Sequence, residues 1–280
     1  MTLTLPKFSI WTAACTFFLI IAGALVTSTG SGLSVPDWPL SFGTFFPRMD
    51  GGVLFEHGHR MAAGAVGIMT FVLSAWLWKS EPRRWLCWLG TSAAAAVLLQ
   101  ALLGGLTVLM KLPPQVSIAH AVLAQAFFCL TVALAFYMNR PYRHALVRAR
   151  TDSLNLLSLS ATVLLFIQLA LGAALRHFGS PKFLYLHATL AGTAAVLNFA
   201  LLYRTWPGRR DAGSLFRPAL AVSGLILAQI CLGLLSIFPS IIALDMSWLA
   251  RTMIVTAHVA VGALILAASL FATLKSMEPA

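Results

Sequence analysis

The sequence predicts an all-α integral membrane protein, with eight transmembrane helices arranged as two pseudo-symmetric four-helix bundles. Three observations lead to this prediction: the composition, the number of long apolar stretches, and a motif that repeats between those stretches. The chain of 280 residues is 59% hydrophobic and only 10% charged, with a mean hydropathy of +0.87. Because soluble domains carry about 25% charged residues, the composition argues against a single soluble core.

The apolar stretches follow one another with little sequence between them. Crossing a bilayer takes roughly 20 mostly apolar residues in a helix, and each stretch meets that length. The first stretch is too long for the core of a cleaved signal peptide, so we expect it to be a retained helix. The longest connection is the first one, residues 30–54. The eight expected helices are 10–29, 55–78, 85–110, 116–138, 154–177, 182–204, 216–238 and 249–274.

The distribution of basic residues predicts the orientation of these helices. Thirteen Lys and Arg side chains lie at one set of helix ends, and six lie at the other. Basic residues are enriched on the cytoplasmic side of a membrane protein, so both termini are expected in the cytoplasm. The net charge of +11 is then a feature of topology and does not indicate a nucleic-acid partner. The loops expected on the outer side are 30–54, 111–115, 178–181 and 239–248.

The four cysteines do not form a recognisable site. Cys15, Cys87, Cys129 and Cys231 all fall inside apolar stretches, and none forms a Cys-x-x-Cys pair. Buried, inert thiols are expected there rather than a disulfide framework.

An internal repeat connects the odd-numbered stretches. A glutamine is followed four residues later by a glycine in the third, fifth and seventh, and a weaker version without the glutamine surrounds Gly23 in the first. The repeat predicts two halves, residues 1–140 and 150–280. The matching pairs are Gln100 and Gly104, Gln168 and Gly172, and Gln229 and Gly233.

The even-numbered stretches share a histidine near the expected outer end, with a small residue one helical turn later. Two histidines that face each other in a bundle core can ligate one haem iron from both sides. The small residues would then leave space for the macrocycle, or they would serve close helix packing; both readings can hold together. The histidines are His59, His120, His187 and His258, and the small residues are Ala63, Ala124, Ala191 and Gly262.

Other roles for the histidines remain open at this point. Any one of them can be a hydrogen-bonded core residue. Zinc would need three or four ligands in one tetrahedral site, which a pair of histidines in each half fits poorly. A path for protons or cations would need ionisable groups toward the inner leaflet, where the sequence offers no such series. The pattern therefore favours two bis-histidine haem positions, His59 with His120 and His187 with His258.

Glu56 distinguishes the first half from the second. It lies three residues before His59, on the same helical face, and can reach a group bound beside the iron. Its alternative role is a favourable charge at a helix N-terminus that pairs with Arg60 four residues later. The other three histidines have Ser117, Leu184 and Val255 at the equivalent position. We therefore expect the chemistry in the first half, with Glu56 as the catalytic residue.

These residues resemble the heme A synthase family over nearly the whole chain. The segment from Gly23 to Ser34, followed by Pro-Asp-Trp-Pro at residues 36–39, is similar to the family's first helix end and first outer loop. Glu56-x-x-His59-Arg60 is similar to its second-helix motif, and the histidines of the later even stretches complete the set. The chain departs from many members in having no cysteine in the first outer loop.

The resemblance implies a haem-dependent oxidoreductase in a prokaryotic plasma membrane. Such an enzyme oxidises the C8 methyl group of heme O to the formyl group of heme A through a hydroxymethyl intermediate. By analogy, His59 and His120 flank the substrate heme O, His187 and His258 ligate a haem b, and Glu56 is the catalytic carboxylate. A heme O synthase is the implied partner, while the electron donor, a protein or a quinol, stays open.

Two other functions fit the same histidines. One is a b-type membrane cytochrome that passes electrons, and the other is a haem transporter or chaperone. Glu56 and the inequality of the halves favour the enzyme. Two haems at the same depth also suit transmembrane electron transfer less well than haems stacked across the bilayer.

Overall fold

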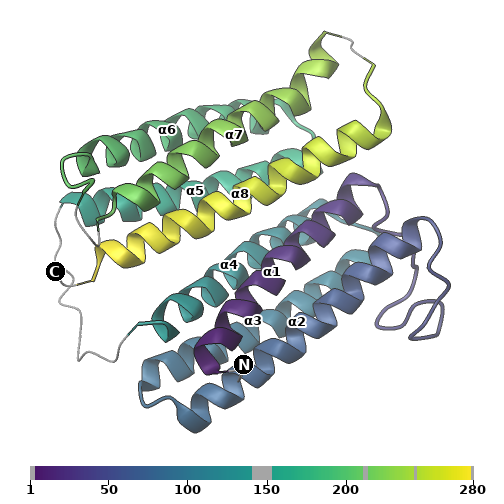
Figure 1. The fold of residues 1–280 in the computed structure, drawn as a ribbon. Helices are drawn as coiled ribbons and strands as arrows, with labels where there is room; N and C mark the ends of the chain where they lie inside the picture. Colours follow the sequence, from purple (N-terminus) through teal and green to yellow (C-terminus); the bar gives the residue numbers. More distant parts are fainter. Residues whose placement is uncertain (1–3, 141–152, 211–213, 243–244, 279–280) are drawn as a thin grey trace. The chain divides into compact units, whose positions relative to one another are not determined.

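The computed structural model describes residues 4–140, 153–210, 214–242 and 245–278, and it confirms the eight predicted helices (Figure 1). Each helix is long and apolar enough to cross a membrane, so the chain is a multi-pass membrane protein. The helices are α1 (Leu5–Ser28), α2 (Gly52–Ser80), α3 (Arg84–Leu109), α4 (Pro114–Met138), α5 (Ser153–Phe178), α6 (Pro181–Thr205), α7 (Phe216–Ile241) and α8 (Trp248–Ser276).

Two helices begin at least three residues earlier than the apolar stretches indicated. Helix α1 starts at Leu5 rather than at residue 10, with Pro6 in its first turn, where the fixed φ of proline suits a helix start. Helix α2 starts at Gly52 rather than at residue 55, directly after Gly51, which has a φ of 52°. Glycine adopts such a positive φ without a steric penalty, so it ends the loop sharply. Both differences arise because hydropathy does not register backbone geometry.

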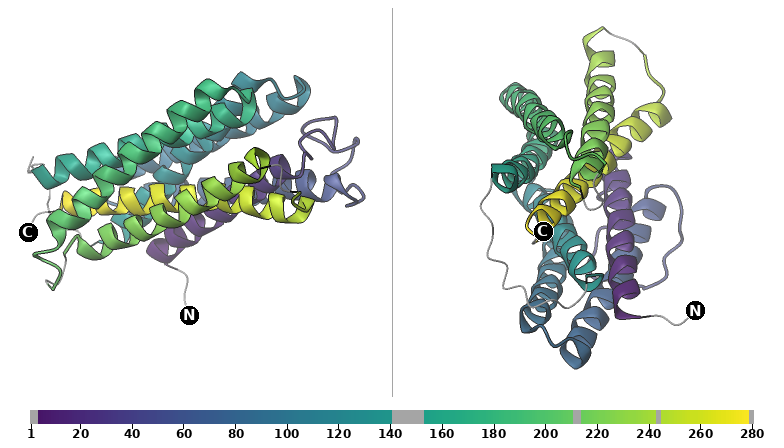
Figure 2. Two further views of the ribbon diagram at one scale, coloured as in Figure 1. Left: turned by 90° about the horizontal axis from the view of Figure 1, so that it is seen from above. Right: turned by 60° about the vertical axis from the view of Figure 1, so that its left-hand side comes forward.

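Helices α1 to α4 form a closed ring in which α1 packs on α2 and α4, and α3 packs on the same two helices (Figures 1 and 2). Their shared core contains side chains such as Leu73, Leu77, Leu86, Phe127 and Leu134, all 2% exposed or less. Lipid tails are as apolar as leucine, so close packing rather than exclusion from water holds membrane helices together.

Contacts divide the chain into two units, Met1–Met138 with Leu232–Ala260 and Asn139–Cys231 with Val261–Ala280. In the second unit α5 packs on α6, and four buried hydroxyls connect α5 to the last part of α8. The Thr162 hydroxyl lies 2.7 Å from that of Ser269 and 2.8 Å from that of Thr273, which lies 2.9 Å from the Ser158 hydroxyl. Hydroxyls in a membrane interior need such partners.

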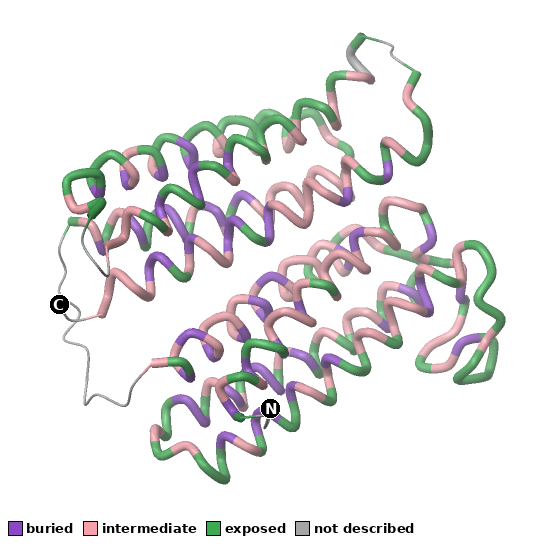
Figure 3. Tube along the Cα trace, in the orientation of Figure 1, coloured by how far each residue is buried: buried purple, intermediate pink, exposed green. Residues whose placement is uncertain are grey.

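The surface of the helices is rich in large apolar side chains. Ile68, Phe71 and Leu102 are between 45% and 67% exposed, and exposed positions recur along each helix (Figure 3). Lipid would cover these faces in a membrane. The predicted division into halves at 1–140 and 150–280 stays a prediction, and most of the junction falls outside the described residues.

Candidate functional site

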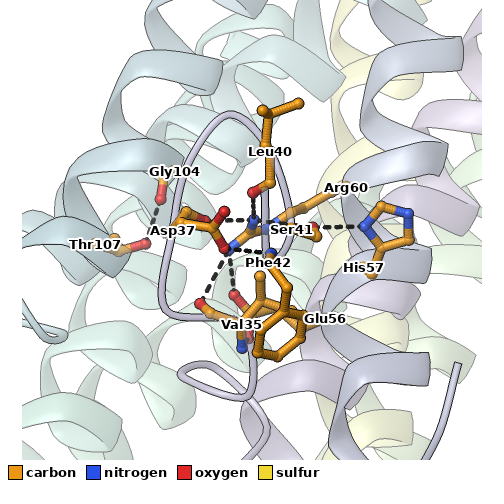
Figure 4. A network of polar contacts seen from close by, with 10 residues as sticks. All are labelled: Val35, Asp37, Leu40, Ser41, Phe42, Glu56, His57, Arg60, Gly104 and Thr107. Carbon is orange, nitrogen blue, oxygen red and sulfur yellow. Dashed lines mark hydrogen bonds and ion pairs between the residues drawn. The ribbon is translucent and has the colours of Figure 1, made fainter. Parts of the chain in front are cut away.

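The long loop between α1 and α2, residues 29–51, is fastened to α2 by Arg60 (Figure 4). One guanidinium nitrogen, Nη1, donates hydrogen bonds to the carbonyl oxygens of Asp37 at 2.8 Å and Leu40 at 3.0 Å. The other, Nη2, donates to the Val35 carbonyl at 3.4 Å. The planar fork of arginine suits this task because its donors diverge in fixed directions. Arg60 therefore organises the loop from inside.

Glu56 joins the same network through both of its carboxylate oxygens. Oε1 accepts a hydrogen bond from Arg60 Nη2 at 2.6 Å, and Oε2 accepts one from the Val35 amide at 2.9 Å. The side chain is buried, and Val35 is fully buried beside it. The pairing of Glu56 with Arg60, which the spacing of four residues suggested, is confirmed. Glu56 thus links α2 to the loop, in addition to lying near His59 in the sequence.

Two further contacts stiffen the loop. The Ser41 hydroxyl lies 2.8 Å from His57 Nδ1, and both residues are buried. The carboxylate of Asp37 accepts hydrogen bonds from the amides of Phe42 at 2.7 Å and Gly43 at 2.8 Å. These bonds, first that of Gly43 and then that of Phe42, hold the pKa of Asp37 below its usual value. The loop is therefore an ordered part of the site.

Trp38 attaches the loop to α3. Its indole lies over Gly105 so closely that a β-carbon there would be 2.6 Å from Trp38 Cδ2. Only glycine leaves room for this contact, which no pattern in the sequence indicated. The loop consequently rests on α2 through Arg60 and on α3 through Trp38.

The four predicted histidines share one structural environment. Each imidazole lies against a glycine on the preceding helix, where a β-carbon would be 3.0 or 3.1 Å from the histidine Cε1. The sequence indicated the glycines as a repeat, but it did not indicate that they receive the rings. The pairs are Gly23 with His59, Gly104 with His120, Gly172 with His187, and Gly233 with His258.

Two of the repeated glutamines hold the histidine backbone as well. Gln100 Nε2 donates to the carbonyl oxygen of His120 at 3.0 Å, and Gln168 Nε2 donates to that of His187 at 2.7 Å. In the second pair His187 Nδ1 also lies 3.2 Å from the Gln168 carbonyl oxygen. The small residue Gly262 has a packing role, since a β-carbon there would lie 3.1 Å from Leu169.

His59 on α2 and His120 on α4 both belong to the ring that α1 to α4 form. Nδ1 of each ring and Oε1 of Gln100 are buried and have no hydrogen-bond partner among the described residues. Buried polar atoms are rarely left without a partner, so they suit a site that takes a polar or metal-bearing group. In the described part of the chain no three His, Cys, Asp or Glu side chains are grouped to hold a bare metal ion. Two imidazoles that rest on glycines in one helix bundle fit a flat macrocycle such as haem.

Comparison with known proteins gives a consistent result. The COX15-CtaA family, described as "Cytochrome oxidase assembly protein", matches residues 6–180. The chain is similar to the heme A synthase of Bacillus pumilus, with 36% identity over 138 residues, 48% of this chain and 45% of that protein.

More distant relatives extend the similarity. The heme A synthase of Alkalihalophilus pseudofirmus is 31% identical over 147 residues, half of each chain. That of Listeria welshimeri is 28% identical over 237 residues, 74% of this chain and 76% of the relative. In the first two alignments the chain spans about half the length of the relatives that it matches.

Proposed function

The chain belongs to the COX15-CtaA family of cytochrome oxidase assembly proteins, and from that premise we propose that it is a heme A synthase. The proposed reaction oxidises the C8 methyl group of heme O to a formyl group through a hydroxymethyl intermediate. The placement of His59 carries the proposal, because its ring is seated on Gly23, its Nδ1 is buried with no hydrogen-bond partner among the described residues, and it lies three residues from the buried Glu56. All of these residues fall within the part that matches the family.

In this proposal the first half, residues 1–140, takes the substrate, and the second half, residues 150–280, keeps a cofactor. His59 and His120 would ligate heme O, while His187 and His258 would ligate haem b. The haem iron, when bound, supplies the oxidising chemistry, and the protein supplies binding and orientation. The unpartnered buried atoms of His59, His120 and Gln100 support the first site.

The network around Glu56 suggests how the chain's own residues contribute. Arg60 keeps the carboxylate oriented through Oε1, while the Val35 amide of the loop holds Oε2. A small movement of the loop would free Oε2 to face the substrate and to accept a proton from it. With Trp38 seated on α3, the same loop would exclude water from the reacting group. Glu56 would then be the catalytic carboxylate, with Arg60 as its positioning partner.

The proposal includes a topology and a partner. Both termini would be cytoplasmic and the haem sites would lie toward the outer side of a bacterial plasma membrane, as the thirteen-to-six division of basic residues indicates. A heme O synthase would deliver the substrate. Fusions of an alkaline phosphatase reporter to the C-terminus and to the long loop test the orientation, since only the loop fusion is expected to be active.

The direct test is to express the chain in a heme A-deficient bacterium that makes heme O, and to separate the extracted haems by chromatography. Heme A or its hydroxymethyl precursor is the expected product. If the purified chain holds only unmodified haem b or heme O while an electron donor is supplied, the proposal fails and a b-type cytochrome or a haem carrier takes its place.

A further inference from the structure

The repeated glutamine and glycine form a two-point support for the histidine of the next helix. Gln100 and Gly104 are four residues apart, so they lie one turn apart on the same face of α3. Gln100 Nε2 lies 3.0 Å from the main-chain oxygen of His120 and 3.3 Å from its ring Nε2, and Gly104 receives the edge of the ring. The contacts of Gln100 determine which turn of α3 lies beside His120. The contact of Gly104 limits how far the imidazole can tilt.

The same support recurs independently between α5 and α6. Gln168 Nε2 donates to the His187 carbonyl oxygen at 2.7 Å. The His187 ring rests on Gly172, where a β-carbon would lie 3.0 Å from Cε1 of the imidazole. The backbone of α5 adds a contact of 3.2 Å between the Gln168 carbonyl and His187 Nδ1. The two hairpins thus position a histidine in the same way.

The hairpin of α1 and α2 has only half of this support. Gly23 receives the His59 ring, but the residue one turn earlier is Leu19, which packs against the hydrophobic core. No side chain of α1, within its described length, donates a hydrogen bond to His59. His59 is therefore held from α1 through its ring alone.

We infer that Gln100 and Gln168 are positioning residues for fixed axial ligands, and that Leu19 leaves His59 as the ligand that releases and rebinds. The inference rests on the proposed function and deepens it. A substrate haem must enter and its product must leave, whereas a resident haem stays. For the substrate haem, His120 would stay in place as a firmly held ligand while His59 lets go and rebinds. For the resident haem, His187 would be the firmly held ligand.

The test measures the rate at which haem leaves the purified full-length protein for an excess of apomyoglobin, after loading with haem b. Leu19→Gln supplies the missing donor and is expected to slow the release from the first half by about fivefold to tenfold, the factor that one net hydrogen bond provides. Gln100→Leu is expected to accelerate it by a similar factor. Release from the second half is expected as a separate, slower phase. Gln168→Leu should accelerate that phase and so assign it to the second half.

Gln125→Leu is the matched control, because Gln125 is a buried glutamine of α4 whose Oε1 has no hydrogen-bond partner among the described residues. It should leave both phases unchanged. Absorption and electron paramagnetic resonance spectra report whether each variant keeps a low-spin, bis-histidine haem. A general loss of packing would alter the spectra of both haems, whereas the loss of one support should alter only one.

Two outcomes separate the inference from the function on which it rests. If the wild-type protein takes up no low-spin haem, the proposed function fails and the inference fails with it. If it takes up haem, but Gln100→Leu releases it at the wild-type rate, the inference alone is overturned. Gln100→Leu decides this even if Leu19→Gln does not accumulate in the membrane.

Discussion

Gly23 of α1 and His59 of α2 touch so closely that a β-carbon on the glycine would lie 3.0 Å from Cε1 of the imidazole. That separation is tighter than an ordinary van der Waals contact, so one of the two groups would have to move. The contact defines where the ring of His59 lies, and it recurs at the other three histidines. The consequences of this arrangement, and of the loop beside it, can be tested one at a time.

Gly23→Ala should displace the His59 ring and reduce the haem content of the first half. Gly64→Ala is the control, because Gly64 is also helical but a β-carbon there meets nothing within 4 Å. Alanine normally stabilises a helix relative to glycine by about 0.5–1 kcal/mol, so the control should keep or raise the melting temperature. Haem spectra and thermal melts measure both effects, and equal haem content in the two variants would contradict the prediction.

Arg60→Ala should release the long loop from α2. The change leaves Glu56 buried without its cation, and breaking such a buried pair costs about 3–5 kcal/mol. Limited proteolysis should then cut within residues 29–51. Arg48→Ala is a suitable control, since the ion pair of Arg48 with Asp50 is exposed and such pairs contribute about 0–1 kcal/mol. Cleavage at the same rate in both variants would show that Arg60 does not fasten the loop.

Glu56→Gln separates a chemical role from a structural one. The amide oxygen can still accept a hydrogen bond from Val35 or Arg60, so the loop should keep most of its resistance to protease. Haem binding should persist while the conversion of heme O falls by at least about 100-fold, the usual contribution of a group that transfers a proton. A structural role would give a different result: Glu56→Gln would still convert heme O, and Glu56→Ala would lose both the conversion and the protection of the loop from protease.

Gly105→Ala should push Trp38 off α3, because a β-carbon would lie 2.6 Å from the indole. Overpacking of this kind costs about 1–3 kcal/mol. Gly67→Ala provides the comparison, since its nearest neighbour, a Val97 methyl, would be at an ordinary 4.0 Å. Tryptophan emission should shift to the red in Gly105→Ala. The shift should be absent when Trp38→Phe is combined with it, which would assign the shift to Trp38. An unshifted spectrum with normal stability in Gly105→Ala would refute the prediction.

The loop should also loosen in acid. The amides of Gly43 and Phe42 lower the pKa of Asp37 in the folded protein below 3.8, the ordinary value. Stability from the ionised carboxylate is therefore fully present above the ordinary value and is lost as the pH falls through the lowered one. Amide hydrogen exchange at residues 42 and 43, corrected for intrinsic rates, should accelerate in that window, and Asp37→Asn should abolish the dependence.

The sequence predicted the helices well, because long apolar stretches have one stable structure in a membrane. It also indicated the four histidines through their recurrence in the even-numbered stretches, although their role as haem ligands stays a prediction. The pairing of Glu56 with Arg60 followed from their spacing along one helix. The sequence missed the contact of Trp38 with Gly105 and the hydrogen bonds from Arg60 to the loop carbonyls. An irregular loop has no periodicity from which its path can be inferred. The seating of His59 on Gly23 depends on the mutual rotation of two helices, which one sequence does not specify.

The contacts between glycines and histidines are all made between helices that are neighbours in the sequence. Each pair of helices can therefore place its histidine as soon as both have left the ribosome and entered the membrane. The proposed substrate site, which needs only α1 to α4, can be complete while the C-terminal helices are still being translated. Loading of haem during synthesis is thus compatible with this architecture.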